Sequence, residues 1–144
     1  MSQQEATLLL GSNLGDPKSN IGLALHLIEK DIGEIIKKTE MVFTEPVEFA
    51  SNNIFCNIAL VIKTQFSPIK LLDKIKLIER EMGRANDTLI SGVYQDRIID
   101  IDVVCVGHLH FCCNELKIPH QKHLYQREFS RKLLDELSSI CKSF

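Results

Sequence analysis

Two carboxylates two residues apart are the part of this sequence best suited to metal chemistry. Asp100 and Asp102 interrupt a run of β-branched apolar residues, which is the composition of a buried strand. Because side chains alternate along a strand, both carboxylates should lie on one face, roughly 6.6 Å apart. With an effective dielectric constant of about 20, they would repel each other by about 2.5 kcal/mol. Magnesium bound together with phosphate oxygens would offset this repulsion. The alternative is a solvated acidic face that Arg97 partly neutralises.

A second group of residues also has metal-ligand chemistry. Cys105, His108, His110, Cys112 and Cys113 fall within nine residues of one another. Their spacing differs from that of zinc fingers and ribbons, in which paired ligands come from two separate segments. Alternate residues of a single strand also do not converge on a tetrahedral ion. We therefore expect reduced thiols here, and we keep a zinc site as the less favoured interpretation.

Composition places the chain among ordinary globular proteins. Its 144 residues are 44% hydrophobic and 25% charged, which predicts one domain over residues 1–144. The formal net charge of −2 gives no basic footprint for nucleic acid or for an anionic membrane. We see no signal peptide, no apolar stretch near the roughly 20 residues of a membrane span and an odd number of cysteines. These features predict a cytoplasmic protein.

Periodicity predicts the elements that would position the acid pair. Asp16-Pro17 and Ser67-Pro68 each supply an N-cap residue followed by proline at the first helical position. Gly33 follows the first helix and is well placed to end it. Strands are expected at about 6–10, 34–44, 54–64 and 97–106, helices at about 17–32, 68–82 and 128–140, and a tight turn over residues 11–16.

This order of elements is the split βαβ arrangement of a ferredoxin-like fold. It predicts an α+β sandwich in which a four-stranded, mainly antiparallel sheet has helices packed on one face. A short hairpin and a helix follow at the C-terminal end. The other face would be free for ligands. Phe55 and Asn57 should share that face with the acid pair, as an aromatic shelf and an amide that reads a polar heterocycle.

Six short segments occur in a distinctive order along the chain. They are LGSNLGD at 10–16, TEP at 44–46, FCN at 55–57, IEREMGR at 78–84, DRIIDID at 96–102 and IPH at 118–120. This order resembles that of the hydroxymethyl-dihydropterin pyrophosphokinases of folate synthesis, from about residue 7 to residue 140. That family has a ferredoxin-like fold and transfers pyrophosphate from ATP to the hydroxymethyl group of 6-hydroxymethyl-7,8-dihydropterin. The resemblance implies a transferase with ATP as co-substrate and two magnesium ions.

The resemblance also implies roles for individual residues. Asp100 and Asp102 would hold both metal ions, and Arg84 and Arg97 would act with them in catalysis. The expected pterin-binding residues are Thr44, Val47, Phe55, Asn57, Tyr94 and Phe129. The expected nucleotide-binding residues are Glu79, Arg84, Arg97, Val103, His120 and Arg127. Catalysis of this kind depends on positioning and charge neutralisation rather than on covalent chemistry by the protein.

Two other classes of function stay open at this point. One is a catalytically silent ferredoxin-like module that binds a pterin or a nucleotide without turnover. The other is a zinc-binding module that uses Cys105, His108, His110 and Cys112. For the pyrophosphokinase we expect a monomer whose partners are the small molecules ATP and hydroxymethyl-dihydropterin, with no nucleic acid and no membrane.

Overall fold

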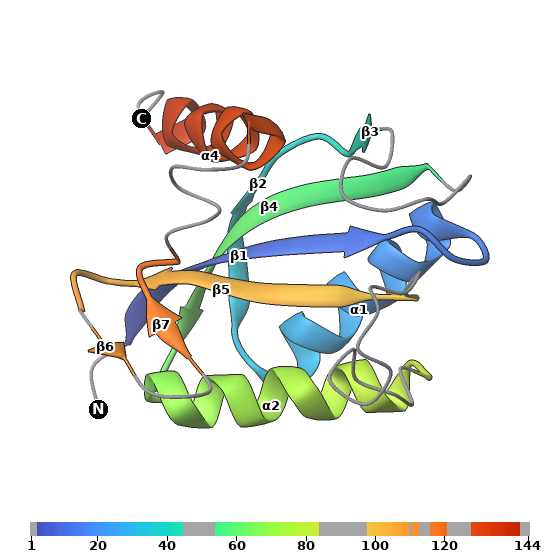
Figure 1. Cartoon of the computed structure of the whole chain (residues 1–144). Coiled ribbons are helices and arrows are strands. Elements are labelled where there is room, and N and C mark those ends of the chain that lie inside the picture. The colour runs from blue at the N-terminus through green and yellow to red at the C-terminus, as the bar shows by residue number, and fades with distance from the viewer. Residues whose placement is uncertain are drawn as a thin grey trace.

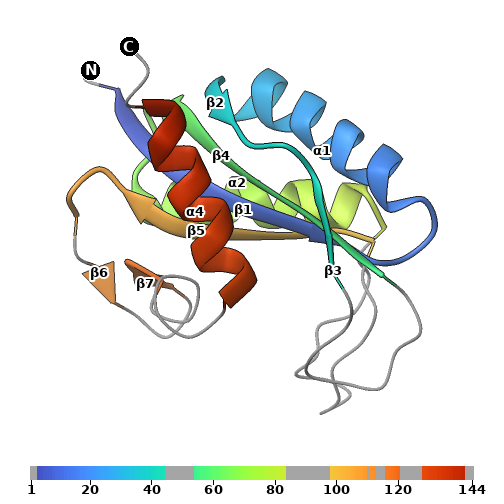
Figure 2. The ribbon, with the colours of Figure 1, turned by 90° about the horizontal axis from the view of Figure 1, so that it is seen from above.

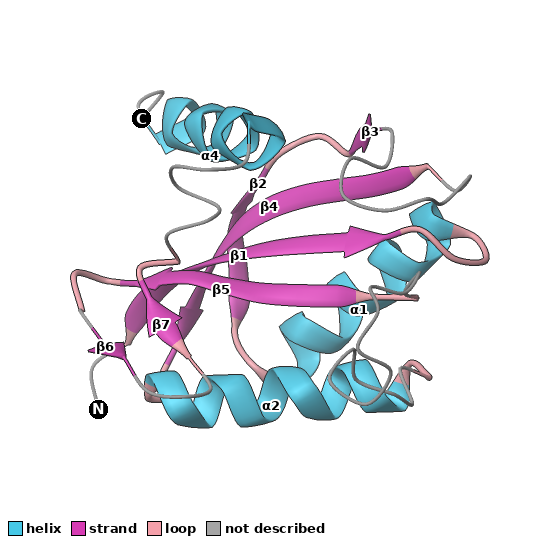
Figure 3. Ribbon diagram, in the orientation of Figure 1, coloured by secondary structure: helices cyan, strands magenta, loops and turns pink. Residues whose placement is uncertain are grey.

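The computed structural model describes residues 3–44, 54–83, 98–109, 111–112, 116–120 and 128–141. Three helices and two antiparallel sheets account for most of these residues (Figures 1 and 3). In chain order the elements are β1 (Gln4–Ser12), α1 (Pro17–Asp31), β2 (Glu34–Lys38), β3 (Val42–Thr44), β4 (Phe55–Thr64), α2 (Pro68–Glu81), β5 (Asp100–Val106), β6 (Phe111–Cys112), β7 (Lys117–Ile118) and α4 (Glu128–Cys141).

The main sheet has the strand order β2-β4-β1-β5, and β3 pairs with the other end of β4. Every one of these pairs is antiparallel. Helices α1 and α2 connect strands that are not neighbours in the sheet, as a split βαβ unit requires. The predicted ferredoxin-like α+β class is therefore confirmed. The two short strands β6 and β7 form the hairpin that was expected before the last helix.

The strand predicted over residues 34–44 is divided into β2 and β3. A register shift interrupts β2 between Ile35 and Lys37. At Thr39 the backbone N–H donates to the carbonyl of Ala59, at 2.9 Å, while the side-chain hydroxyl accepts from the Ala59 N–H, at 3.2 Å. The Thr39 hydroxyl thus takes the place of a ladder carbonyl, so the strand ends and the main sheet has five strands rather than four.

The larger apolar core lies between the sheet and helices α1 and α2. The helices present Ile21, Ala24 and Ile28 from α1 and Leu71, Ile75 and Ile78 from α2, as their spacing predicts. Both predicted caps are present: Asp16 accepts from the Ser19 N–H, and Ser67 accepts from the Lys70 N–H.

The second face of the sheet is partly covered by α4 (Figure 2). Leu133 and Leu137 of α4 pack on Leu9, Ala59 and Val61, which point away from α1 and α2. A face entirely free for ligands was therefore the wrong expectation, since the C-terminal helix is amphipathic and needs an apolar surface to bury its own stripe. Within the described part of the chain, no helix combines the length and the apolar character needed to cross a membrane.

Candidate active site

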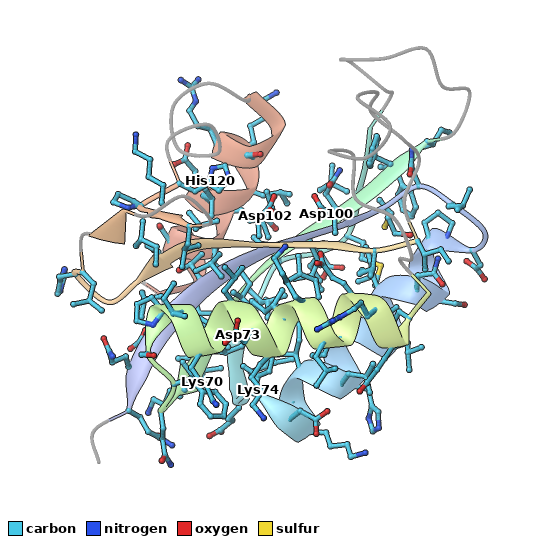
Figure 4. The ribbon with its side chains drawn as sticks, turned by 60° about the horizontal axis from the view of Figure 1, so that its bottom comes forward. Lys70, Asp73, Lys74, Asp100, Asp102 and His120 are labelled. Carbon is cyan, nitrogen blue, oxygen red and sulfur yellow. The ribbon has the colours of Figure 1, made fainter. Side chains whose placement is uncertain are left out.

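The acid pair lies on β5, the strand at one edge of the sheet. Asp100 and Asp102 are both half-buried, whereas Ile99, Ile101 and Val103 are buried in the core. Figure 4 shows both carboxylates on the side of β5 that faces away from α2. The alternation predicted from the sequence is therefore present, and one strand face carries two carboxylates.

Three adjacent strands align one row of residues beside the acid pair. In the antiparallel registers, Gly11 of β1 lies opposite Asn57 of β4 on one side and opposite Asp100 of β5 on the other. Residues that lie directly opposite one another project from the same face of a sheet. The row therefore places a side-chain amide and a carboxylate on one face, with a glycine between them.

Gly11 leaves the space that the Asn57 side chain occupies. A Cβ atom added at Gly11 would lie 2.8 Å from Asn57 Oδ1, which is closer than van der Waals contact allows. Asn57 itself is only 5% exposed, so its amide has little room to move aside. Sequence reasoning missed Gly11 as a site residue. The available signal was a glycine at the end of an apolar strand, which marks a close approach.

The aromatic residue of the predicted shelf lies two positions before Asn57. Phe55 is half-buried, and its backbone pairs with Thr44 of β3. Because the two residues are separated by one position on a strand, Phe55 and Asn57 share a face. This face is the one that carries Asp100, so the described candidates for heterocycle binding and for metal binding are brought together.

Glu79 is held by the strand that carries the acid pair. Its side chain on α2 is 5% exposed, and Oε2 accepts a hydrogen bond from the backbone N–H of Ile101, at 2.9 Å. Ile101 separates the two aspartates in the sequence. The role of Glu79 at the nucleotide stays a prediction, and the structure shows that its carboxylate is bonded to the edge of β5.

His120 is hydrogen-bonded to the same edge of β5, at Val104. Its backbone N–H donates to the carbonyl of Val104, at 2.8 Å, and its side chain is half-buried. Figure 4 shows His120 and both aspartates on one side of β5. The side chain of Val103 is 3% exposed and belongs to the core, so a nucleotide could contact this residue only through its backbone.

A further polar residue organises the turn between β1 and α1. Asn20 Nδ2 donates to Ser12 Oγ, at 3.2 Å, and to the carbonyl of Leu14, at 2.8 Å. The sequence reading assigned Asn20 no role. Gly11 and Ser12 also belong to β1 and not to the turn, which begins after Ser12.

The remaining predicted residues fall outside the described part of the chain. These are Val47, Arg84, Tyr94, Arg97 and Arg127, together with the side chains of Thr44 and Phe129.

The donor set of the acid pair fits magnesium better than zinc. Two carboxylates on a rigid strand leave most of an octahedral shell to water and phosphate oxygens, which is the usual coordination of Mg²⁺. Among the described side chains, no group of three His, Cys, Asp or Glu residues could hold a metal ion. Cys105 and His108 of the alternative zinc cluster are described, whereas His110 and the side chain of Cys112 are not.

A groove of about 350 Å³ lies elsewhere, between α1 and β2. Its lining contains Leu25, His26, Glu29, Ile35, Ile36, Lys37 and Lys38, and none of the predicted site residues. Because β2 and β5 end the main strand order on opposite sides, this groove is separate from the acid pair.

The fold and the site thus define a ferredoxin-like α+β protein with an acid pair on one face of its edge strand. Comparison with known proteins specifies the family. The family model of 7,8-dihydro-6-hydroxymethylpterin-pyrophosphokinase matches residues 7–139. The chain therefore belongs to this family, and the resemblance of its six motifs is confirmed.

Individual relatives agree with this assignment. The 2-amino-4-hydroxy-6-hydroxymethyldihydropteridine pyrophosphokinase of Porphyromonas gingivalis is 35% identical over 132 residues, covering 91% of this chain and 88% of the relative. The protein of the same name from Bacillus subtilis is 29% identical over 138 residues, covering 95% and 78%. Among solved structures, a Plasmodium falciparum HPPK-DHPS triple mutant with pteroate superimposes with a TM-score of 0.65 at 18% identity. This chain covers 39% of that longer chain, and the similarity supports the fold alone.

Proposed function

We propose that this chain transfers pyrophosphate from ATP to the hydroxymethyl oxygen of 6-hydroxymethyl-7,8-dihydropterin, with magnesium held by Asp100 and Asp102. Its family membership carries the pyrophosphokinase activity in folate biosynthesis. The observation that supports the finer assignment is the row Asn57–Gly11–Asp100, because it unites an amide and a metal-binding carboxylate on one sheet face.

In this proposal the pterin lies on the face shared by Phe55 and Asn57. Phe55 stacks on the ring, since aromatic faces add about 0.5–1.5 kcal/mol beyond burial. Asn57 offers an amide donor and a carbonyl acceptor to the polar edge of the heterocycle. Arg84, Arg97 and His120 are proposed to contact the phosphates. Thr44, Val47, Tyr94 and Phe129 are proposed to complete the pterin pocket, and Arg127 is proposed to bind the nucleotide with the backbone of Val103.

The reaction forms one bond and breaks one. The hydroxymethyl oxygen attacks the β-phosphorus of ATP, and the bond from this phosphorus to the oxygen that bridges to the α-phosphate breaks. AMP carries the electron pair away, and the hydroxyl proton passes to solvent. Bound magnesium supplies charge neutralisation at the phosphates. Asp100 and Asp102 contribute by fixing their oxygens on a rigid strand before the substrates bind.

A coupled assay with ATP, magnesium and hydroxymethyl-dihydropterin tests the proposal. We expect AMP and the pterin diphosphate in equal amounts, with no AMP when the pterin is omitted. AMP is the informative product, because transfer of a single phosphoryl group would give ADP. ADP as the product, or AMP formation that does not depend on the pterin, would contradict the proposal.

This assay tests the first alternative class, and metal analysis of the purified protein tests the second. A silent binding module would bind the pterin and form no AMP, and a zinc module would contain stoichiometric zinc after purification. Family membership does not favour either alternative.

We also propose that the chain acts as a single-domain, cytoplasmic monomer, and light scattering during size-exclusion chromatography tests the oligomeric state.

A further inference from the structure

The outer edge of β5 is bonded to groups from outside the sheet. One side of β5 pairs with β1, whereas no described strand of the main sheet lies along the other side. An edge of this kind presents backbone N–H and C=O groups that need partners. Glu79 accepts from the Ile101 N–H, and the carbonyl of Val104 accepts from the His120 N–H.

Glu79 accepts its hydrogen bond from the residue that lies between the two aspartates. In an antiparallel ladder, neighbouring residues alternate between bonding to the partner strand and pointing their N–H groups away from it. The N–H of Ile101 points away from β1. At this residue, between the two aspartates, β1 therefore accepts no hydrogen bond from the β5 N–H. Glu79 therefore supplies the contact that the sheet lacks there.

A buried carboxylate is an unusual choice for this position. Glu79 lies beside the apolar stripe of α2, next to Ile78 and four residues after Ile75, and both of these side chains are buried in the core. Burying a charge carries a large desolvation penalty. An ionised carboxylate that accepts from a backbone N–H bonds about twice as strongly as a neutral acceptor, so an amide at this position tests whether charge contributes to holding the strand.

We infer that Glu79 is a positioning residue for the metal-binding pair, acting through the Ile101 N–H and not by side-chain contact with the nucleotide. This inference rests on the proposed function, because it takes Asp100 and Asp102 as the metal ligands. With the peptide between them fixed from α2, the two carboxylates keep one mutual geometry. Groups that orient metal ligands from outside the coordination shell contribute on the order of 10–100-fold to metal affinity.

Two variants of Glu79 and one matched control test this role. Glu79→Gln keeps an oxygen acceptor and removes the charge, whereas Glu79→Ala removes the acceptor. The control is Asp73→Asn, which removes an exposed charge from α2, the helix that also carries Glu79 (Figure 4). Circular dichroism and thermal unfolding establish that each variant is folded.

Three measurements are made on each protein. They are the amide hydrogen-exchange rate of Ile101 in the free protein, the dissociation constant of Mn²⁺ with a non-hydrolysable ATP analogue, and the affinity for that analogue without divalent metal. In Glu79→Ala we expect faster exchange at Ile101 and a dissociation constant for Mn²⁺ that rises about 10-fold or more. We expect a smaller rise in Glu79→Gln, unchanged metal-free nucleotide affinity in both, and no change in Asp73→Asn.

Two outcomes would overturn the inference. If both Glu79 variants weaken metal-free nucleotide binding and leave Mn²⁺ affinity unchanged, Glu79 contacts the nucleotide directly. If Ile101 exchanges faster while Mn²⁺ affinity stays the same, the bond is only structural. None of these measurements requires turnover, so failure of the proposed reaction is detected separately, as missing pterin-dependent AMP formation by the unaltered chain. An unaltered chain that binds no Mn²⁺ with the analogue would contradict both the inference and the proposed metal site.

Discussion

At Asp100 and Asp102 the fold holds two like charges on one face of β5. Replacing either with asparagine should leave folding intact, because the change removes about 2.5 kcal/mol of repulsion between the two carboxylates and keeps a polar side chain of nearly the same shape. Magnesium-dependent activity should fall by roughly 100-fold or more, since the change removes a proposed metal ligand itself. The checks are AMP formation as a function of magnesium concentration and the thermal unfolding midpoint. Unchanged activity of either variant at low magnesium would exclude the metal assignment.

Gly11 gives a second prediction, on pterin affinity. In Gly11→Ala the new methyl group meets Asn57 Oδ1, so the amide must leave its position. Displacing a side chain by about 30° from its rotamer costs roughly 0.5–1.5 kcal/mol, which corresponds to a loss of up to about 10-fold in pterin affinity. Calorimetric titration with the pterin measures this loss.

Two controls show whether the Gly11 effect passes through Asn57. Gly22→Ala adds the same methyl group in α1, where no heavy atom lies within 4 Å of the new Cβ, and it should leave pterin affinity unchanged. In an Asn57→Ala background, Gly11→Ala should cause little further loss. An equal loss in both backgrounds would mean that the glycine acts by another route.

Cys56 lies between Phe55 and Asn57 but on the core side of β4. Burial raises the pKa of its thiol above the ordinary value. The unfolded chain therefore loses this proton at a lower pH than the folded chain, so stability should fall as the pH rises through the ordinary thiol pKa. We expect the unfolding free energy between pH 8 and pH 10 to decline less steeply in Cys56→Ala. Identical slopes in both proteins, from denaturant titrations, would contradict this cause.

At the scale of residues, the sequence predicted alternation but not register. The faces of Asp100, Asp102, Phe55 and Asn57 follow from the period of two along a strand. The contact of Gly11 with Asn57 depends on which strands pair and at what offset, and a single sequence does not specify either. The bond from Glu79 to Ile101 joins residues 22 positions apart, so it too required the folded structure.

Among the elements, local signals were the most informative. Asp16-Pro17 and Ser67-Pro68 begin α1 and α2, because N-caps act on the next few residues only. Gly33 was expected to end α1 because glycine adopts backbone conformations that stop a helix. Helix α1 does end just before it, at Asp31. The structure gives a different reason for the glycine: a Cβ there would collide with the carbonyl oxygen of Lys63 on β4.

Non-local interactions explain the elements that were mispredicted. Thr39 divides β2 from β3 through its bonds to Ala59, which lies 20 residues away. The apolar stripe of α4 was visible in the sequence, but a stripe does not say which surface it will cover. The covered surface belongs to alternate residues of β1 and β4 that point away from the first two helices.

The start of α2 provides a prediction at the scale of elements. The Ser67 hydroxyl accepts from the Lys70 N–H, and replacing such a cap with alanine costs about 1 kcal/mol. Ser67→Ala should therefore lower the unfolding free energy by about this amount, whereas Ser67→Asp should retain the acceptor and most of the stability. Denaturant titration measures both. An equal loss in the two variants would show that the hydroxyl does not cap the helix.

The whole molecule has apolar clusters on both faces of one sheet. Alternate residues of β4 contribute to each: Ile58 and Leu60 face α1 and α2, while Ala59 and Val61 face α4. Since one backbone carries both sets, loss of either cluster should disturb the other. This coupling predicts that α4 unfolds together with the rest of the described fold and not as a separate unit.

Leu133→Ala tests this coupling. Leu133 is 2% exposed in the α4 cluster, and truncating a buried leucine costs about 2–5 kcal/mol. Hydrogen exchange of backbone amides gives one denaturant midpoint for α2 and one for α4. If unfolding is cooperative, the variant should lower both midpoints by the same amount. Leu109→Ala, at a side chain that is 42% exposed, should leave both midpoints nearly unchanged. Protection lost from α4 alone would mean that the helix detaches from the sheet before the larger core unfolds.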